Sequence, residues 1–346
     1  MTIKRTVFGR LATGEPVYRY LLQNRRGSQV AVLSYGATWQ SFIPNGKIGR
    51  DIVVHYDDLA AYLNNPLHLG NTIGPVGGRL SANTYQLEPG QSFRLSPNEG
   101  DHVLHSGQNG FDLVNWSAMV EEGPGFDQVR FTHHFNNEFP GVLTVTVTYQ
   151  LDDQGQVTIS FTGRTTATTL FNPMTHVYFN LSGQNRTIQP AELRLAADQR
   201  VVVDGAKLPT GKLMKTAGSA YDFSHFRSLG MALAELPQHQ LDDAWLLKPR
   251  IRNEPVVALQ DPRTKQRLTI QSDRNGVVVF TVNPAALQHD AAWEASQPPT
   301  AVAIELQTLP DAINHQDFGD ILLLKGQEKT YTVHYQVDEV NINESI

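Results

Sequence analysis

Hydrophobic and polar residues alternate in several stretches of this chain with the period of two that is typical of a β-strand. One face of residues 301–307 (AVAIELQ) is aliphatic, while the other carries small side chains with one carboxylate, Glu305, and one amide, Gln307. Pro310 and Asp311 then end the strand in a turn. Because small residues surround the carboxylate, we interpret the Glu305 face as the floor of a cleft. A plain surface strand is the alternative, since glutamate is usually exposed.

The same alternation predicts an antiparallel hairpin, in which residues 141–150 and 156–163 flank the turn 152–155. Further strands are predicted over residues 29–38, 170–181, 256–259, 267–271, 276–283 and 330–337. Helical patterns are short and cover residues 58–64 and 228–236. With 27 glycines and 19 prolines, this pattern predicts an all-β fold, a large antiparallel sandwich or barrel, in which residues 1–346 form a single domain.

Composition narrows the possible partners. The formal net charge of −6 and the pI near 6.0 argue against a nucleic-acid binder. The sequence has no cysteine, which excludes disulfides and thiolate chemistry. The N-terminus has no signal-peptide pattern, and no apolar run of about 18 residues occurs. We therefore expect a cytoplasmic protein without a membrane partner, with monomer and homodimer both left open.

A second polar face lies on the predicted strand 170–181 (LFNPMTHVYFNL). His176, Tyr178 and Asn180 fall on one face of it, and apolar side chains fall on the other. Each of the three can donate or accept a hydrogen bond, which suits a hydroxyl-rich ligand. The alternative is an ordinary strand with a hydrogen-bonded histidine.

Two further segments carry side chains that could bind a ligand or take part in catalysis. Residues 98–116 (NEGDHVLHSGQNGFDLVNW) combine loop histidines, His102 and His105, with aromatic residues, a composition common in carbohydrate sites. These histidines lack a partner at a known zinc spacing, so no metal site is predicted. The pair Asp242-Asp243 is compatible with a metal site, a glycosidase pair or solvated turn residues. No G-x-S-x-G motif supports a serine hydrolase.

Taken together, the ordered motifs resemble those of the aldose 1-epimerase (galactose mutarotase) family over most of the chain. The similar segments are LSYGAT at 33–38, the loop ending at Arg79, LHSGQNGFDLVNW at 104–116, THVYFNLSG at 175–183, LPTG at 208–211, YDF at 221–223, LDDAWLL at 241–247 and IELQTLPDAIN at 304–314. The resemblance implies a mutarotase-like β-sandwich, no cofactor, and interconversion of the α and β anomers of a free sugar such as galactose or glucose.

The resemblance also implies roles for individual residues. Glu305 aligns with the family's catalytic base, and His176 aligns with the acid that protonates the ring oxygen. Glutamate and histidine have ordinary pKa values of about 4.3 and 6.5, so near neutral pH the pair supplies a base and a partly charged acid. The expected substrate-binding residues are His105, Arg79 and Asp242, which would hold sugar hydroxyls, and Trp245, which would form an apolar wall.

The chain departs from the family pattern at several positions. The family commonly has asparagine where Gly78 and Thr175 stand, a ligand-facing glutamine at Val278, a histidine at Asp243 and an arginine at Pro75. Loss of a group that bonds one substrate hydroxyl can shift selectivity strongly. A disaccharide with a free reducing end, such as maltose, is therefore an alternative substrate.

Three other functions are weighed against this one. A non-catalytic sugar-binding or sensing protein on the same scaffold would be expected to lack Glu305 or His176, and both are present. A sugar-phosphate epimerase needs several cationic side chains around its pocket, and Arg79 is the candidate within a motif. A glycosidase would use Asp242 and Glu305 as its carboxyl pair.

Overall fold

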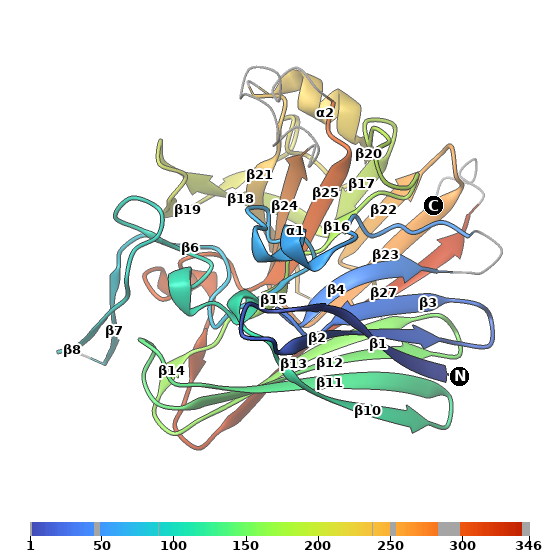
Figure 1. The fold of residues 1–346 in the computed structure, drawn as a ribbon. Helices are drawn as coiled ribbons and strands as arrows, with labels where there is room; N and C mark the ends of the chain where they lie inside the picture. Colours follow the sequence, from blue (N-terminus) through green and yellow to red (C-terminus); the bar gives the residue numbers. More distant parts are fainter. Residues whose placement is uncertain are drawn as a thin grey trace.

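The computed structural model describes residues 2–44, 49–88, 90–236, 238–249, 254–282 and 298–340. Within these ranges the chain is built mostly of antiparallel strands, which confirms the all-β prediction (Figure 1). The helices found there are short: α1 (Leu59–Leu63), α2 (Leu229–Glu235) and the 3-10 helices η1 (Gly107–Asn109), η2 (Phe111–Leu113) and η4 (Gln316–Phe318). None of the described helices has the length and apolar character needed to cross a membrane.

Three sheets carry most of the described strands. The largest runs in the order β10 (Ser117–Gly123), β11 (Phe126–Phe135), β12 (Leu143–Asp152), β13 (Val157–Thr165), β27 (Glu328–Glu339), β23 (Gln266–Ser272), β22 (Val257–Asp261), β17 (Glu192–Leu195), β20 (Arg227–Ser228). The second runs in the order β16 (Tyr178–Phe179), β25 (Ala301–Gln307), β24 (Gly276–Val282), β21 (Asp242–Leu247), β18 (Ala197–Val203), β19 (Pro209–Lys215). The third runs in the order β1 (Thr2–Arg10), β2 (Pro16–Gln23), β3 (Gln29–Leu33), β4 (Thr38–Ile43).

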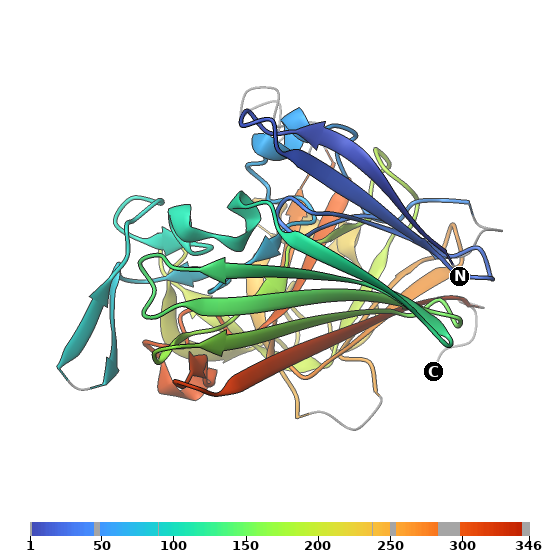
Figure 2. The same ribbon diagram turned by 60° about the horizontal axis from the view of Figure 1, so that its bottom comes forward.

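Further described strands form short two-stranded ladders outside these sheets. They pair β5 (Thr72–Ile73) with β15 (Met174–Thr175), β6 (Arg79–Leu80) with β9 (Val103–Leu104), β7 (Thr84–Glu88) with β8 (Gln91–Arg94), and β14 (Thr169–Leu170) with β26 (Leu322–Leu323). Figure 2 shows β10, β11, β12, β13 and β27 side by side as one curved layer, while the β7–β8 hairpin projects from the body of the molecule.

One large hydrophobic core fills the space between the three sheets. Trp39 of β4 is fully buried in this core, and its ring contacts Tyr149 of β12, Phe179 of β16 and Tyr335 of β27. A single side chain from the third sheet thus touches strands of the other two. Aromatic contacts of this kind add to the hydrophobic stabilisation.

Most of the elements predicted from the sequence are confirmed. The hairpin is formed by β12 and β13, and β25 covers residues 301–307 with a turn after it. Both helical patterns form helices, and each helix begins at a side-chain cap, Asp58 for α1 and Ser228 for α2. The strand predicted over 276–283 ends at residue 282, and residue 283 lies outside the described residues.

The prediction of one continuous strand over 170–181 is wrong. The segment forms three two-residue strands, β14, β15 and β16, and each pairs with a different partner strand. Pro173 has no N–H to donate to a sheet ladder, so the chain cannot continue through it as a central strand. The alternation of faces nevertheless holds around His176, because the apolar neighbours Val177 and Phe179 lie in the large core.

We predict that Trp39→Ala lowers the free energy of unfolding by about 3–5 kcal/mol, because it leaves a cavity where the sheets meet. Urea unfolding followed by circular dichroism measures this change. Met119→Ala is the matched control, since Met119 is exposed on the edge strand β10 and its removal should change stability by about 0.5 kcal/mol or less. Equal effects of the two substitutions would contradict the account of the core.

Candidate active site

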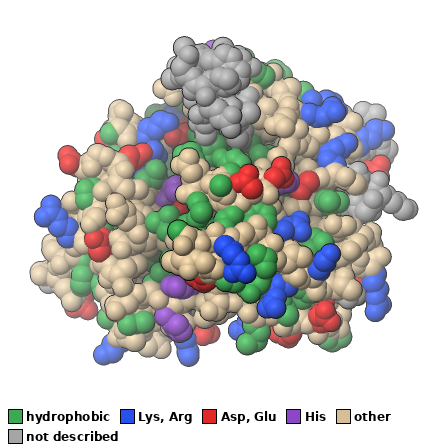
Figure 3. Space-filling model, in the orientation of Figure 1, with side chains coloured by type: hydrophobic (Ala, Val, Ile, Leu, Met, Phe, Trp, Pro, Cys, Tyr) green, Lys and Arg blue, Asp and Glu red, His purple; other side chains and the backbone are tan. Residues whose placement is uncertain are grey.

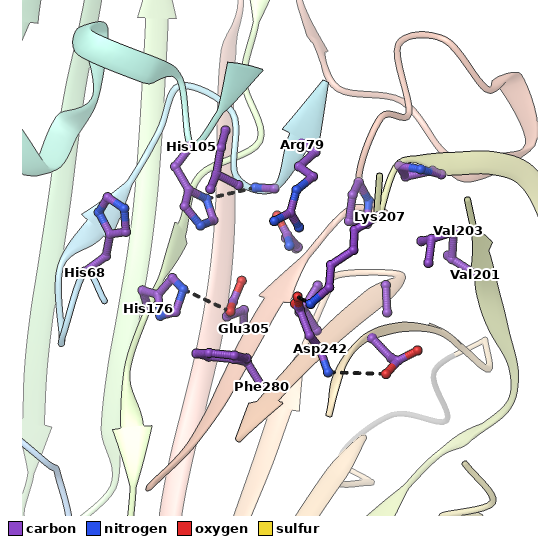
Figure 4. Close-up of a pocket in the computed structure, with 18 of the residues that line it drawn as sticks. His68, Arg79, His105, His176, Val201, Val203, Lys207, Asp242, Phe280 and Glu305 are labelled. Carbon is purple, nitrogen blue, oxygen red and sulfur yellow. Dashed lines mark hydrogen bonds and ion pairs between the residues drawn. The ribbon is translucent and has the colours of Figure 1, made fainter. Parts of the chain in front are cut away.

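A pocket lies over the face of the second sheet that is turned away from the large core (Figure 4). Its floor is formed by side chains from three neighbouring strands: Asp242 and Ala244 of β21, Val278 and Phe280 of β24, and Glu305 and Gln307 of β25. Figure 3 shows that histidine, acidic and hydrophobic side chains lie together towards the middle of the face seen in Figure 1. The interpretation of the Glu305 face as the floor of a cleft is therefore confirmed.

Five of the six predicted site residues line this pocket, and they come from distant parts of the chain. They are Arg79, His105, His176, Asp242 and Glu305. Glu305 lies in the middle of β25, while His176 lies between β15 and β16, and β16 pairs with β25. The strand pairing therefore places the carboxylate and the imidazole next to each other.

The contact between these two groups is the feature of the site that most resembles a catalytic acid–base pair. His176 Nε2 lies 3.2 Å from Glu305 Oε1, and both residues are almost completely buried. Burial, together with the neighbouring His68, lowers the pKa of His176 to about 3. Burial also raises the pKa of Glu305 well above its usual range; Asp242 adds to this increase and Arg79 opposes it. The pair thus holds one proton around neutral pH, and burial favours the arrangement in which both groups are neutral.

His105 is fixed in one tautomer by the backbone. The Gly78 N–H donates to His105 Nδ1 over 3.1 Å, so Nδ1 is an acceptor and Nε2 carries the hydrogen of the neutral ring. Burial, with nearby His68, His176 and Arg79, lowers the pKa of His105 well below its usual value. His105 therefore offers the pocket a neutral N–H donor.

Arg79 and Asp242 are each held by a side chain of opposite charge. Arg79 Nε and one of its terminal nitrogens lie 2.7 and 2.9 Å from the two oxygens of Glu99, a bidentate pair that fixes the guanidinium plane. Lys207 Nζ lies 2.5 Å from Asp242 Oδ2. Lys207 belongs to the turn between β18 and β19, so this ion pair joins that turn to β21.

Trp245, the sixth predicted residue, does not form a wall of the pocket, and this expectation is corrected. Its side chain is only 1% exposed and belongs to the large core, where it contacts Phe223, while its Nε1–H donates to the Tyr221 carbonyl oxygen. Along β21, Asp242 and Ala244 face the pocket, so the alternation of the strand turns Trp245 to the other side. The apolar lining of the pocket instead includes Val278, which pairs in register with Glu305, and Phe280 of the same strand.

The sequence analysis did not identify His68 and Lys207 as lining residues of the pocket. Both lie in turns at positive φ, +51° and +60°, where no strand or helix pattern marks them. Gln307 was placed on the correct face, and both polar atoms of its buried amide lack a partner among the described residues. A Cβ at Gly77 would lie 2.5 Å from Gln307 Oε1, so the glycine leaves room for this amide.

The side chains of the described residues include no group of three or more His, Asp or Glu arranged to hold a metal ion. His102, the other histidine of the 98–116 segment, contacts the Ser81 carbonyl oxygen at 3.0 Å and does not line the pocket. The chemistry that the pocket itself offers is proton transfer between a carboxyl and an imidazole, with polar groups that can bind hydroxyls around them.

Comparison with known proteins gives a consistent result. The family model described as aldose 1-epimerase matches residues 18–336. Maltose epimerase from Levilactobacillus brevis is 38% identical over 344 residues, which cover 97% of this chain and 99% of that protein. Galactose mutarotase from Bos taurus is 29% identical over 97% of this chain and 98% of its own length.

Solved structures agree with these sequence matches at the level of the fold. The crystal structure of galactose 1-epimerase from Lactobacillus acidophilus NCFM superposes with a TM-score of 0.85, at 24% identity, and covers 98% of this chain and 99% of that one. Because the family match covers residues 18–336, most of the chain and every strand that lines the pocket, this chain belongs to the aldose 1-epimerase family.

Proposed function

We propose that this protein interconverts the α and β anomers of a free reducing sugar, with Glu305 as the base and His176 as the acid. The observation that carries the proposal is the 3.2 Å contact between His176 Nε2 and Glu305 Oε1 at the floor of the pocket. Two groups this close can reach adjacent oxygens of one pyranose ring, the anomeric hydroxyl and the ring oxygen. Membership of the aldose 1-epimerase family supports the reaction class.

The reaction moves two protons and breaks one bond. Glu305 takes the proton of the anomeric hydroxyl while His176 gives its proton to the ring oxygen. The bond between the anomeric carbon and the ring oxygen breaks, and the anomeric carbon becomes an aldehyde. Rotation about the adjacent carbon–carbon bond exposes the other face of the carbonyl, and reclosure reverses both transfers. No atom is gained or lost, so no cofactor is needed.

Burial of the pair favours the ring-opening direction of proton transfer. Before ring opening the pair is ionised, with a carboxylate at Glu305 and an imidazolium at His176. After ring opening both groups are neutral, which is the arrangement that burial stabilises. Sugar oxygens that bond the ionised pair take the place of water while the substrate is bound.

Three further residues supply the contacts that orient a sugar in this pocket. His105 presents an N–H donor, and Arg79 presents a guanidinium held in plane by Glu99. Asp242 offers a carboxylate that can accept from sugar hydroxyls, with Lys207 beside it. Holding the ring in one orientation is what brings both reacting oxygens to the catalytic pair.

We predict that Glu305→Gln lowers the catalysed rate of anomer interconversion by about 10²–10⁴-fold, because the amide keeps the shape of the side chain and removes its basicity. Polarimetry of freshly dissolved α-glucose, α-galactose and β-maltose measures the rate with and without protein. Glu122→Gln is the matched control, since Glu122 is exposed on the edge strand β10 and should leave the rate unchanged. A wild-type protein that accelerates none of these sugars would overturn the proposed function.

A second candidate substrate, maltose, is favoured by the apolar part of the pocket. Val278 stands where a ligand-facing glutamine is common in the family, and Val201 and Val203 of β18 also line the pocket. Apolar side chains can pack on the C–H face of a second sugar ring. The relative named maltose epimerase is also more similar to this chain than the mutarotase from Bos taurus, at 38% against 29% identity.

The maltose proposal predicts that kcat/KM for maltose exceeds that for galactose by about tenfold or more. Val278→Gln should narrow this ratio, because it returns a hydrogen-bonding group beside Glu305. Val120→Gln, which changes an exposed valine of β10, should leave the ratio as it is. A wild-type preference for galactose, measured by the same polarimetric assay, would exclude maltose as the preferred substrate.

The structure gives less support to a sugar-phosphate substrate. Such a pocket would need free cations for the phosphate. Arg79 is already paired with Glu99, and Lys207 with Asp242, so both cationic side chains of the pocket have acidic partners within the described residues.

A further inference from the structure

His68 lies beside His176 and has no role in the reaction described above. It lines the pocket, and its ring centroid lies 5.0 Å from that of His105 and 6.0 Å from that of His176. Figure 4 shows the three histidines together on one side of the pocket, with Lys207 and Asp242 on the other. His68 is 27% exposed, whereas His176 is 7% exposed, so His68 lies nearer the pocket opening.

We propose that His68, oriented by Asp112, is a specificity-determining residue that binds one hydroxyl of the sugar together with His105. This inference rests on the proposed function, because it assigns a contact within the same pocket. Three observations carry it: the partner of His68, the burial of that partner, and the opposite hydrogen-bonding character of the two neighbouring imidazoles.

Asp112 holds one nitrogen of the His68 ring. His68 Nδ1 lies 2.9 Å from Asp112 Oδ2, so Nδ1 carries a hydrogen and donates to the carboxylate. Among the described residues no other group bonds the His68 ring. In the neutral imidazole Nε2 is therefore an acceptor with no protein partner, at a site that lines the pocket.

Burying the Asp112 carboxylate costs desolvation free energy. Such a cost is typical of a carboxylate that serves a site, here by orienting His68. Asp112 is only 6% exposed, and within the described ranges His68 is the one basic side chain that pairs with it. A buried carboxylate with a single imidazole partner is expensive to keep. The local backbone makes room for it, because a Cβ at Gly110 would lie 2.2 Å from Asp112 Oδ1.

The two neighbouring imidazoles offer complementary groups to a ligand. His105 receives a backbone N–H at Nδ1 and presents Nε2–H, whereas His68 donates from Nδ1 and presents a bare Nε2. A hydroxyl group both donates and accepts, so one hydroxyl can donate to His68 and accept from His105 at the same time. Neither a methylene nor an ether oxygen can satisfy both rings. A site built to bond a hydroxyl discriminates strongly against a substrate that lacks it.

A panel of monodeoxy sugars tests this contact. The sugar that the wild-type protein turns over best is compared with analogues that each lack one hydroxyl of the reducing ring, and kcat/KM is measured for each. We expect one analogue to lose about tenfold or more with the wild type because of the lost pair of hydrogen bonds. With His68→Phe, which keeps a ring of similar size, kcat/KM for the parent sugar should fall, and the penalty for the missing hydroxyl should shrink, because only the bond to His105 remains.

Two further variants separate binding from a general structural effect. His68→Gln can place an amide oxygen near the position of Nε2, so it should restore part of the penalty. Asp112→Asn removes the carboxylate that fixes the ring and should shrink the penalty for the same hydroxyl. His134→Phe is the matched control, since His134 is exposed on β11, and its penalties should equal those of the wild type. Ratios between sugars do not change when part of a sample is unfolded, so a loss of stability cannot imitate the expected result.

The inference is overturned if His68→Phe leaves every ratio as in the wild type, or lowers kcat/KM for the parent sugar and all analogues by the same factor. Either result would show that His68 recognises no individual hydroxyl. This failure is distinct from failure of the proposed function, in which the wild-type protein accelerates anomer interconversion of no sugar at all.

Discussion

The contact between His176 and Glu305 is the interaction on which the account of this protein depends. In water a carboxylate and an imidazole titrate independently, near pH 4.3 and 6.5. In this pocket both are nearly free of solvent and lie 3.2 Å apart, so they share one proton as a unit. In the proposed reaction, a sugar bound over this pair gives the proton of its anomeric hydroxyl to Glu305 and receives a proton from His176 at its ring oxygen. Anomer interconversion, the function proposed above, needs such a pair of a base and an acid.

The fold supplies this contact by using both faces of one strand. On β25 the side chains of Val302, Ile304 and Leu306 are packed into the core between the sheets, and Glu305 points to the opposite side. The packing of the apolar face fixes the position of the carboxylate, and the pairing of β16 with β25 fixes the position of the histidine segment. The residues that vary from the family pattern, such as Val278, lie beside this pair and change what surrounds the sugar.

Sequence patterns predicted the parts of the site that lie on regular strands. Alternation placed Glu305 and Gln307 on one face of β25, and motif resemblance identified His176, Arg79 and Asp242. The apolar wall that the resemblance implied for Trp245 is wrong, because this side chain lies on the face of β21 that packs into the large core.

The residues that the sequence did not reveal lie where the backbone is irregular. His68 and Lys207 occupy turns at positive φ, and their partners Asp112 and Asp242 are 44 and 35 residues away along the chain. No periodic pattern predicts such contacts, because they depend on how separate loops meet. The segment 170–181 was misjudged for a related reason: its strands pair with three different partners, and the pairing is decided by the tertiary structure.

The pH dependence of kcat/KM for anomer interconversion, corrected for the uncatalysed reaction, tests the shared proton most directly, because this constant reports the titration of the free protein. As the pH falls, a second proton must enter a pair in which the pKa of His176 is lowered to about 3. The account therefore predicts a rate constant that stays level from about pH 7 down to about pH 5. A decline with its midpoint near pH 6.5, the ordinary value for histidine, would mean that His176 titrates on its own, and it would contradict the account.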